Sequence, residues 1–244
     1  MASETWRLLS TWDESAEFHM GFDQAQLDGG CEPPTLRLYT WLPDALSLGY
    51  FQPKDDVRDL GLATHVVRRM TGGGAIHHVN ELTFSITVRH NHPLYRGPVG
   101  PSYVRVHAAI ASALSEVAVE ADLRGDTSVS SDRSGTGMCF HDSTALDLVW
   151  NGRKGVGSAQ RRKATGTLHH GSIKLSPSSM ESGVATASEG GQVLTPQEFA
   201  PILCRAFEAE LDIQLAPERP QDDEIAAAQR LGPHYSSTEM LERR

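Results

Sequence analysis

Short segments with the two-residue alternation of a β-strand outnumber helical segments along this chain, and that balance most constrains its fold. The clearest lies at residues 82–88, where four apolar side chains share one face: Leu82, Phe84, Ile86 and Val88. Residues 36–41 alternate similarly and predict a half-buried strand, and further strand candidates are residues 45–50, 65–70 and 168–175. Because these strands follow one another largely as neighbours, we predict an α+β fold, a mixed β-sheet with helices packed mainly on one face.

A β-hairpin is predicted around the dipeptide Asn151-Gly152. Residues 146–150 form one extended segment, and a second short extended segment follows the dipeptide. Asn-Gly tolerates the positive φ angles that a type I′ turn requires, so the two segments are expected to pair as antiparallel strands.

Three segments have the spacing of an amphipathic helix. A capping box at Thr11 to Glu14 is expected to open the first, which ends at Gly29-Gly30 and buries Phe18, Phe22 and Ala25. Ser102 is predicted to cap the second, whose apolar positions are Val104, Ala108, Ala111 and Leu114. Residues 195–198 (Thr-Pro-Gln-Glu) open the third, with a stripe of Phe199, Ile202, Leu203, Phe207 and Leu211.

The chain is expected to form one domain with a short appendage. Residues 1–215 are assigned to the domain, since they contain all the strand candidates. Residues 216–244 are charged and interrupted by prolines, so they are predicted to form a short C-terminal helical tail. Residues 125–137 are rich in Gly, Ser, Asp and Thr and are predicted to be a loop.

Composition excludes several classes of function. The net charge is −9 and no long basic block exists, so a nucleic-acid partner is not expected; the one basic cluster, Arg161-Arg162-Lys163, suits a compact anion. The sequence contains no run of about 18 apolar residues, so no membrane-spanning segment is expected. The N-terminal residues lack the pattern of a signal peptide, and three widely spaced cysteines do not form a disulfide framework. These features predict a cytoplasmic protein.

Three short motifs carry the candidate chemistry. A strand candidate delivers the chain into Gly72, Gly73 and Gly74, where a ligand can lie on bare backbone and the preceding Arg68 and Arg69 add positive charge. Lys154 lies between a tight turn and a second glycine-rich stretch, and His169-His170 precede the last strand candidate. Taken singly, each motif has a simpler interpretation: a flexible turn, a solvated lysine, or a structural histidine pair.

Together and in this order, the motifs resemble the biotin/lipoate cofactor transferase family in its lipoate branch, the lipoate–protein ligases and octanoyltransferases. The resemblance spans about residues 34–175 and includes residues 34–39 and 46–52 upstream. It implies a catalytic domain like those of biotin and lipoate ligases, with the acyl chain in an apolar tunnel over the sheet. The substrate-binding positions that it implies are Arg69, Thr71, Gly72, Gly73, Gly74, Ala75, His78, Gly157, Ser158, Ala159, Gln160, His170 and Gly171.

The resemblance also implies catalytic residues. Lys154 is expected at the acyl carbonyl, polarising it or taking the proton from the incoming lysine amine; general-base work would need a lowered pKa, which glycines and neighbouring cations are expected to provide. Cys139 lies just after the flexible loop and resembles the cysteine of the cysteine-dependent octanoyltransferases, so it is the predicted nucleophile, with His141 as an aid to its ionisation. Cys31 and Cys204 are expected to be structural, and a buried structural role for Cys139 is the alternative.

The implied reaction moves an octanoyl or lipoyl group from acyl carrier protein, through a thioester, to a lysine of a lipoyl carrier domain. The acceptor is a 2-oxoacid dehydrogenase or a glycine-cleavage H-type protein, and the transferase needs no cofactor. The unbroken glycine triplet is more typical of ligases, so an ATP- and Mg²⁺-dependent lipoate–protein ligase stays open. The accessory C-terminal domain of longer ligases is not expected in this chain, which disfavours a single-chain ligase but leaves open a ligase with a separate partner. A non-catalytic lipoyl-domain binding protein and a histidine-based metal enzyme are further alternatives, although no metal-ligand spacing is present.

Overall fold

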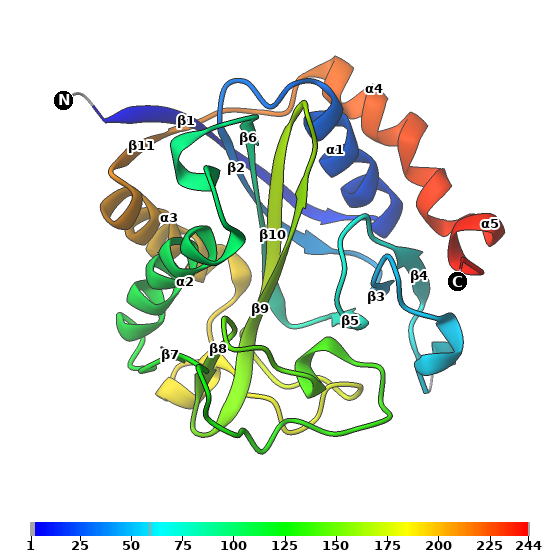
Figure 1. Ribbon diagram of the computed structural model, residues 1–244, viewed down its shortest axis with the longest axis vertical. Helices are drawn as coiled ribbons and strands as arrows, with labels where there is room; N and C mark the ends of the chain where they lie inside the picture. Colours follow the sequence, from blue (N-terminus) through cyan, green and yellow to red (C-terminus); the bar gives the residue numbers. More distant parts are fainter. Residues whose placement is uncertain (1–2, 59, 244) are drawn as a thin grey trace.

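An eight-stranded mixed sheet forms the centre of the computed structural model, which describes residues 3–58 and 60–243. The strand order is β11-β1-β2-β6-β10-β9-β8-β7, and Figure 1 shows β9 and β10 running through the middle of the molecule. Strand β1 pairs in parallel with both neighbours, and the pairs from β2 to β7 are antiparallel. The bounds are β1 Glu4–Glu14, β2 Thr35–Trp41, β6 Glu81–Arg89, β7 Asp122–Leu123, β8 Leu148–Trp150, β9 Arg153–Arg162, β10 Gly166–Lys174 and β11 Ile213–Pro217.

A second, three-stranded sheet has the order β4-β3-β5. Its bounds are β3 Ala45–Leu48, β4 His65–Arg68 and β5 Ile76–His78. The helices are α1 Ala16–Asp28, α2 Val99–Ser115, α3 Pro196–Leu211, α4 Asp222–Leu231 and α5 Thr238–Leu241. The α+β class and the mixed sheet are therefore confirmed. Within the described residues, no helix is long and apolar enough to cross a membrane.

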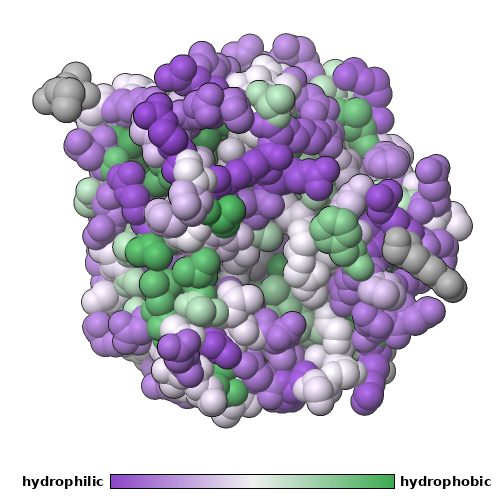
Figure 2. Space-filling view, viewed as in Figure 1, coloured by the Kyte–Doolittle hydropathy of each residue, from purple (hydrophilic) through white to green (hydrophobic). Residues whose placement is uncertain are grey.

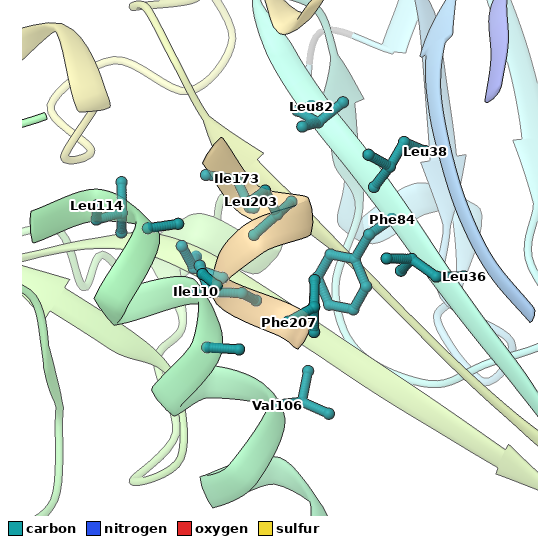
Figure 3. Close-up of a cluster of buried hydrophobic side chains, with 14 of the residues drawn as sticks. Leu36, Leu38, Leu82, Phe84, Val106, Ile110, Leu114, Ile173, Leu203 and Phe207 are labelled. Carbon is teal, nitrogen blue, oxygen red and sulfur yellow. The ribbon is translucent and has the colours of Figure 1, made fainter. Parts of the chain in front are cut away.

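The helices cover both faces of the large sheet, whereas the sequence predicted mainly one. Helices α2 and α3 pack on one face over the largest apolar cluster, where Phe84 of β6 points toward Phe207 of α3 (Figure 3). Helix α1 packs on the opposite face, and α4 packs against α1. Strand β2 is consequently buried at all seven positions instead of half-buried, with Arg37 on the α1 side bonded to Asp23.

Two helix boundaries differ from the prediction. Helix α1 is capped by Ser15, and Thr11 belongs instead to β1, an unpredicted strand held by its pairing with β2 and β11. Helix α2 starts at Val99 after Pro98, and it turns Val106 and Ile110 inward while Val104 is 43% exposed. Small apolar residues occur all around α2, so the face that packs is decided by α3 and the sheet.

The hairpin and the third helix are confirmed. Asn151 and Gly152 have φ angles of 49° and 68°, and they join β8 to β9. Thr195 and Glu198 form the capping box of α3. The segment after residue 215 contains more structure than a short helical tail. The assigned boundary falls within β11, and Arg7 of β1 bonds Glu218 and Glu224 beyond it.

We expect Phe84→Ala to lower the free energy of unfolding by about 3–5 kcal/mol, because a fully buried ring leaves a cavity between the sheet and α3. Urea unfolding measures the change. Phe51→Ala is the matched control, since Phe51 is 74% exposed and its loss should cost less than about 0.5 kcal/mol. Equal costs for the two substitutions would contradict this account of the core.

Candidate active site

A cavity of about 490 Å³ lies where the predicted motifs converge. Figure 2 shows a hollow near the middle of the face drawn, with hydrophobic side chains gathered beside it. Of the predicted site residues, all but Thr71 and Ala75 line the cavity. Its apolar walls come from the helices and both sheets: Met20, Tyr39, Trp41, Ile76, Val99, Tyr103 and Leu146. The structure therefore brings together residues that are more than 100 positions apart in the sequence.

The two predicted catalytic side chains meet at this cavity. Lys154 is 1% exposed, and its Nζ lies 3.5 Å from the Cys139 Sγ. The same ammonium donates hydrogen bonds to the main-chain carbonyls of Cys139 at 2.9 Å and Asp142 at 3.3 Å. Strand β9 carries the lysine, and a single 3₁₀ turn at residues 139–141 presents the cysteine. A thiol held this close to a cation is a good candidate nucleophile.

Asp147 completes the charged end of the cavity and was not identified from the sequence. Its Oδ2 lies 2.9 Å from the Lys154 Nζ, and its side chain is only 5% exposed. Burial alone would lower the pKa of Lys154, but the facing Cys139 thiolate and the Asp147 carboxylate outweigh burial and raise it. The expectation of a lowered pKa is therefore wrong. The only sequence signal was one acidic residue within the apolar segment 146–150.

The glycine triplet forms a loop fastened by Arg69. The Arg69 guanidinium donates to the carbonyls of Gly72 and Gly74, both at 2.7 Å, and to the carbonyl of Ser47 at 2.9 Å. Gly73 has a φ of 94°, and a Cβ there would lie 2.9 Å from Arg69 Nη2 and 3.9 Å from Cys139 Sγ. Only glycine fits this narrow space between a cation and the thiol.

The glycine loop is also joined to the cysteine loop through the backbone. Ala75 donates to the carbonyl of Gly137 at 2.8 Å, and Cys139 donates to the carbonyl of Ala75 at 2.7 Å. A Cβ on Gly74 would lie 2.9 Å from the Cys139 nitrogen. Ala75 thus does not line the cavity, but its two backbone hydrogen bonds hold the cysteine loop next to the glycine triplet.

Arg68 does not contribute charge to the glycine loop as expected. Its guanidinium is buried on the other side of β4 and donates to the carbonyls of Gly49, Gln52, Met240 and Leu241. Successive side chains of a strand point to opposite faces, so Arg68 and Arg69 necessarily diverge. Arg68 therefore holds the C-terminal segment in place.

His170 connects the cavity to the buried ion pair of Asp23 and Arg37. Its Nδ1 lies 2.9 Å from Asp23 Oδ2 and donates to that carboxylate. Its Nε2 therefore accepts from the Thr71 hydroxyl, whose oxygen lies 2.6 Å from it. Asp23 lies 2.7 Å from Arg37; burial raises the pKa of Asp23, but Arg37 and His170 together outweigh burial and lower it to about 2. Thr71, which precedes the triplet, is positioned by this chain of bonds.

Two other buried histidines fix Ser158 on the α2 side of the cavity. The Ser158 Oγ lies 2.7 Å from His107 Nε2 and 2.9 Å from His169 Nε2. The Nδ1 of His107 donates to the carbonyl of Leu146, so its Nε2 accepts from Ser158. Burial lowers the pKa of His107 to about 4, which keeps the ring neutral near pH 7.

His78 lines the cavity from β5 but is itself firmly held. It stacks on Trp41 with ring centres 3.8 Å apart and bonds both Glu81 and Ser47. Burial lowers its pKa to about 4, against the opposing influence of Glu81. A neutral, stacked ring serves as a wall of the cavity.

His141 does not face the thiol that it was expected to help ionise. Its two ring nitrogens lie 3.2 Å from the Thr136 hydroxyl and 3.3 Å from the Ser182 carbonyl, so the 3₁₀ turn directs it away from Cys139. Among the described residues, no group of histidine, cysteine and carboxylate side chains is arranged to hold a metal ion.

Comparison with solved structures identifies the fold as that of lipoate ligase catalytic domains. The bi-partite lipoate protein ligase of Thermoplasma acidophilum superposes with a TM-score of 0.78 at 20% identity, over 99% of this chain and 98% of that one. The lipoyl protein ligase A/B catalytic domain family matches residues 16–197, and the chain belongs to this family.

Its relatives are similar over much of their length. Octanoyltransferase LipM of Moorella thermoacetica is 40% identical over 184 residues, which cover 72% of this chain and 67% of the relative. Octanoyltransferase LipM of Brevibacillus brevis is 30% identical over 93% of this chain and 95% of the relative. The chain is thus an enzyme of lipoyl or octanoyl transfer, as the order of its motifs predicted.

We expect Cys139 to be alkylated faster than the other two cysteines. Burial raises the pKa of Cys31 to about 11 and of Cys204 to about 12, whereas Cys139 faces the Lys154 ammonium. Iodoacetamide labelling at pH 7.5, followed by mass spectrometry, measures the three rates. Lys154→Met should slow the labelling of Cys139 on the order of tenfold and leave the other two unchanged. A rate unaffected by this substitution would mean that the ammonium does not activate the thiol.

Proposed function

We propose that this chain transfers an octanoyl group from acyl carrier protein, through a thioester on Cys139, to a lysine of a lipoyl carrier domain. The observation that carries the proposal is the 3.5 Å approach of a buried ammonium to the Cys139 thiol at the end of a largely apolar cavity. The relatives named octanoyltransferase support octanoate as the acyl group.

In the first step, the Cys139 thiolate attacks the carbonyl carbon of the octanoyl thioester. A new carbon–sulfur bond forms, the bond to the carrier's sulfur breaks, and the carrier leaves as a thiolate. Lys154 lies beside the sulfur as an ammonium, so it can stabilise the attacking thiolate and protonate the departing one. Its raised pKa fits the role of an acid in this step.

In the second step, the amine of the acceptor lysine attacks the Cys139 thioester, forming an amide and releasing the cysteine sulfur. Acylation of Cys139 removes the thiolate, which is the largest influence that raises the pKa of Lys154. Without that influence the pKa of Lys154 falls from its raised value; Lys154 has lost its proton to the carrier thiolate, and the neutral amine can take a proton from the attacking lysine. The charge of one sulfur atom thereby changes Lys154 from an acid into a base.

The walls of the cavity suit a saturated acyl chain. Trp41, Tyr39 and Met20 lie on the α1 side, while the acyl carbonyl would lie at the charged end beside Lys154. The polar atoms of His78 and His170 are already bonded, to Glu81 and Ser47 and to Asp23 and Thr71 respectively. An octanoyl chain can bury its apolar surface here without leaving a charged group unpaired.

A lipoate–protein ligase that activates free lipoate with ATP is the second candidate. The unbroken triplet Gly72, Gly73 and Gly74 favours it, as does the name of the Thermoplasma acidophilum protein of the same fold. In that reaction Lys154 would stabilise an acyl adenylate, and Cys139 would have no covalent role.

We expect acylation of an apo lipoyl domain by octanoyl–acyl carrier protein without ATP, detected as a mass increase of the domain. Cys139→Ser should lower this transfer at least about a thousandfold, because an alcohol is a poor nucleophile beside an ammonium. Cys204→Ser is the matched control and should leave the rate unchanged. Acylation that requires ATP and free lipoate, and that survives Cys139→Ser, would instead identify the ligase.

We expect Asp147→Asn to lower kcat/KM on the order of a hundredfold, because it removes one charge that keeps Lys154 protonated and in place. Loss of that charge lowers the pKa of Lys154, so the alkaline limb of the pH profile should move to lower pH by roughly one unit. Asp147→Glu should restore part of the rate and the position of the limb. A uniform loss of activity with an unchanged profile would assign Asp147 a purely structural role.

A further inference from the structure

A second groove, of about 400 Å³, lies between β9, α1 and the C-terminal segment, and the proposed reaction leaves it unused. We call it the cationic groove, lined by Gln24, Asp28, Tyr50, Met70, Arg161, Lys163, Arg230, Leu231, His234, Tyr235, Glu239, Met240 and Arg243. Four of these side chains are Lys or Arg and two are acidic, in a chain whose net charge is −9. The groove therefore concentrates positive charge on an acidic protein.

Two of the three arginines of the groove are available to a ligand. Arg161 and Arg243 lie over the ring of Tyr50, with guanidinium carbons 5.3 and 4.4 Å from the ring centre. Within the described part of the chain, neither of them forms a salt bridge with a carboxylate. Lys163, in contrast, pairs with Asp28 at 3.1 Å. Two guanidiniums held apart by an aromatic ring can both turn toward one anion.

The basic cluster Arg161-Arg162-Lys163 is divided between the two faces of β9. Arg162 points toward α2, donating to the carbonyl of Gly97 just before the helix at 2.7 Å and to the Ser102 hydroxyl within it at 3.3 Å. Arg161 shares its face with Ala159 and Gly157, because side chains alternate along a strand. Both of those residues line the catalytic cavity, so one face of β9 leads from the thiol to the groove.

A second contact joins the two sites. Tyr50 donates its backbone N–H to the carbonyl of Thr71 at 2.8 Å, directly before the glycine triplet. Met70 lines the groove, and its neighbour Arg69 lines the cavity. In Figure 2, strongly hydrophilic side chains lie above the central hollow, over the upper part of the β9–β10 hairpin. The groove thus adjoins the catalytic cavity.

We propose that the cationic groove docks the acyl carrier protein that donates the octanoyl group; this inference rests on the proposed function. The donor carries its acyl group on a phosphopantetheine arm, which joins the protein through a phosphodiester. Arg161 and Arg243 would bind this phosphate and neighbouring carboxylates, since guanidinium groups match the geometry of both anions. The arm would then run along the Gly157–Arg161 face of β9 to Cys139.

Distance favours the donor over the acceptor as the occupant. Arg161 lies four residues along the strand from Gly157, roughly 13 Å away at the usual rise per residue. A pantetheine arm contains two amide-linked segments and can span this gap. An acceptor lysine has only four methylene groups, so its domain must dock at the mouth of the cavity itself.

The test compares two octanoyl donors in the full chain, octanoyl–acyl carrier protein and octanoyl-pantetheine, which lacks the phosphate and the protein. For the double variant Arg161→Ala with Arg243→Ala, we expect KM for the carrier-bound donor to rise on the order of tenfold, with a weaker dependence on salt. KM for octanoyl-pantetheine and for the acceptor domain should change less than about twofold. Arg205→Ala is the matched control, because Arg205 is an exposed arginine of α3 outside both sites.

The outcomes are distinguishable. If the double variant still uses the carrier-bound donor with an unchanged KM, the docking role of the groove is rejected and the proposed function is unaffected. A raised KM for the acceptor domain instead shows that the groove takes the acceptor, which also overturns the inference. If the wild-type chain uses neither thioester, the proposed function fails. Titration of the chain with holo carrier protein then tests the docking role of the groove by itself. Binding that the double variant weakens supports this role, and absent or unchanged binding rejects it.

Discussion

The ammonium of Lys154 is the group on which the rest of the site depends. A buried cation is costly unless charges and hydrogen-bond acceptors surround it, and here two side chains and two main-chain carbonyls do so. These four partners come from the cysteine turn, its following residues and Asp147. The lysine therefore holds the segment of residues 139–147 against β9. The contacts that stabilise the ammonium are the same ones that assemble the reactive centre.

Glycines make this arrangement possible on both sides of the cavity. A Cβ on Gly157 would lie 2.9 Å from the Lys154 Cε, so a side chain there would displace the lysine. A Cβ on Gly73 would similarly collide with the arginine that fastens the triplet. The two glycine-rich stretches, far apart in sequence, serve one purpose: they let cationic side chains lie directly against backbone.

Much of this could be predicted from the sequence, because local patterns specify strands, the hairpin and the α3 cap. Alternation identified β6, and Asn151-Gly152 identified the β8–β9 turn. The motifs located Cys139, Lys154 and the triplet. What local patterns could not show were side-chain partners: Asp147 for the lysine, Asp23 for His170, and the direction of His141. Such pairs depend on register and on which face of a strand or helix packs inward, and these are settled by contacts between distant segments. The missed β1 has the same cause, since its place depends on pairing with β2 and β11.

The position of the cavity follows from the unequal lengths of neighbouring strands. Strand β8 has only three residues, and it pairs with β9 no further than Val156. Among the described strands, Gly157 to Arg162 therefore has a partner on one side only, β10. An unpaired strand edge exposes backbone and both sets of side chains. Here the edge lets the cavity extend around β9, from Ser158 and Tyr103 beneath α2 to Ala159 and His170 on the α1 side. A strand β8 that began before Leu148 would close this edge, so the late start of β8, after the segment of residues 139–147, keeps the access to the thiol open.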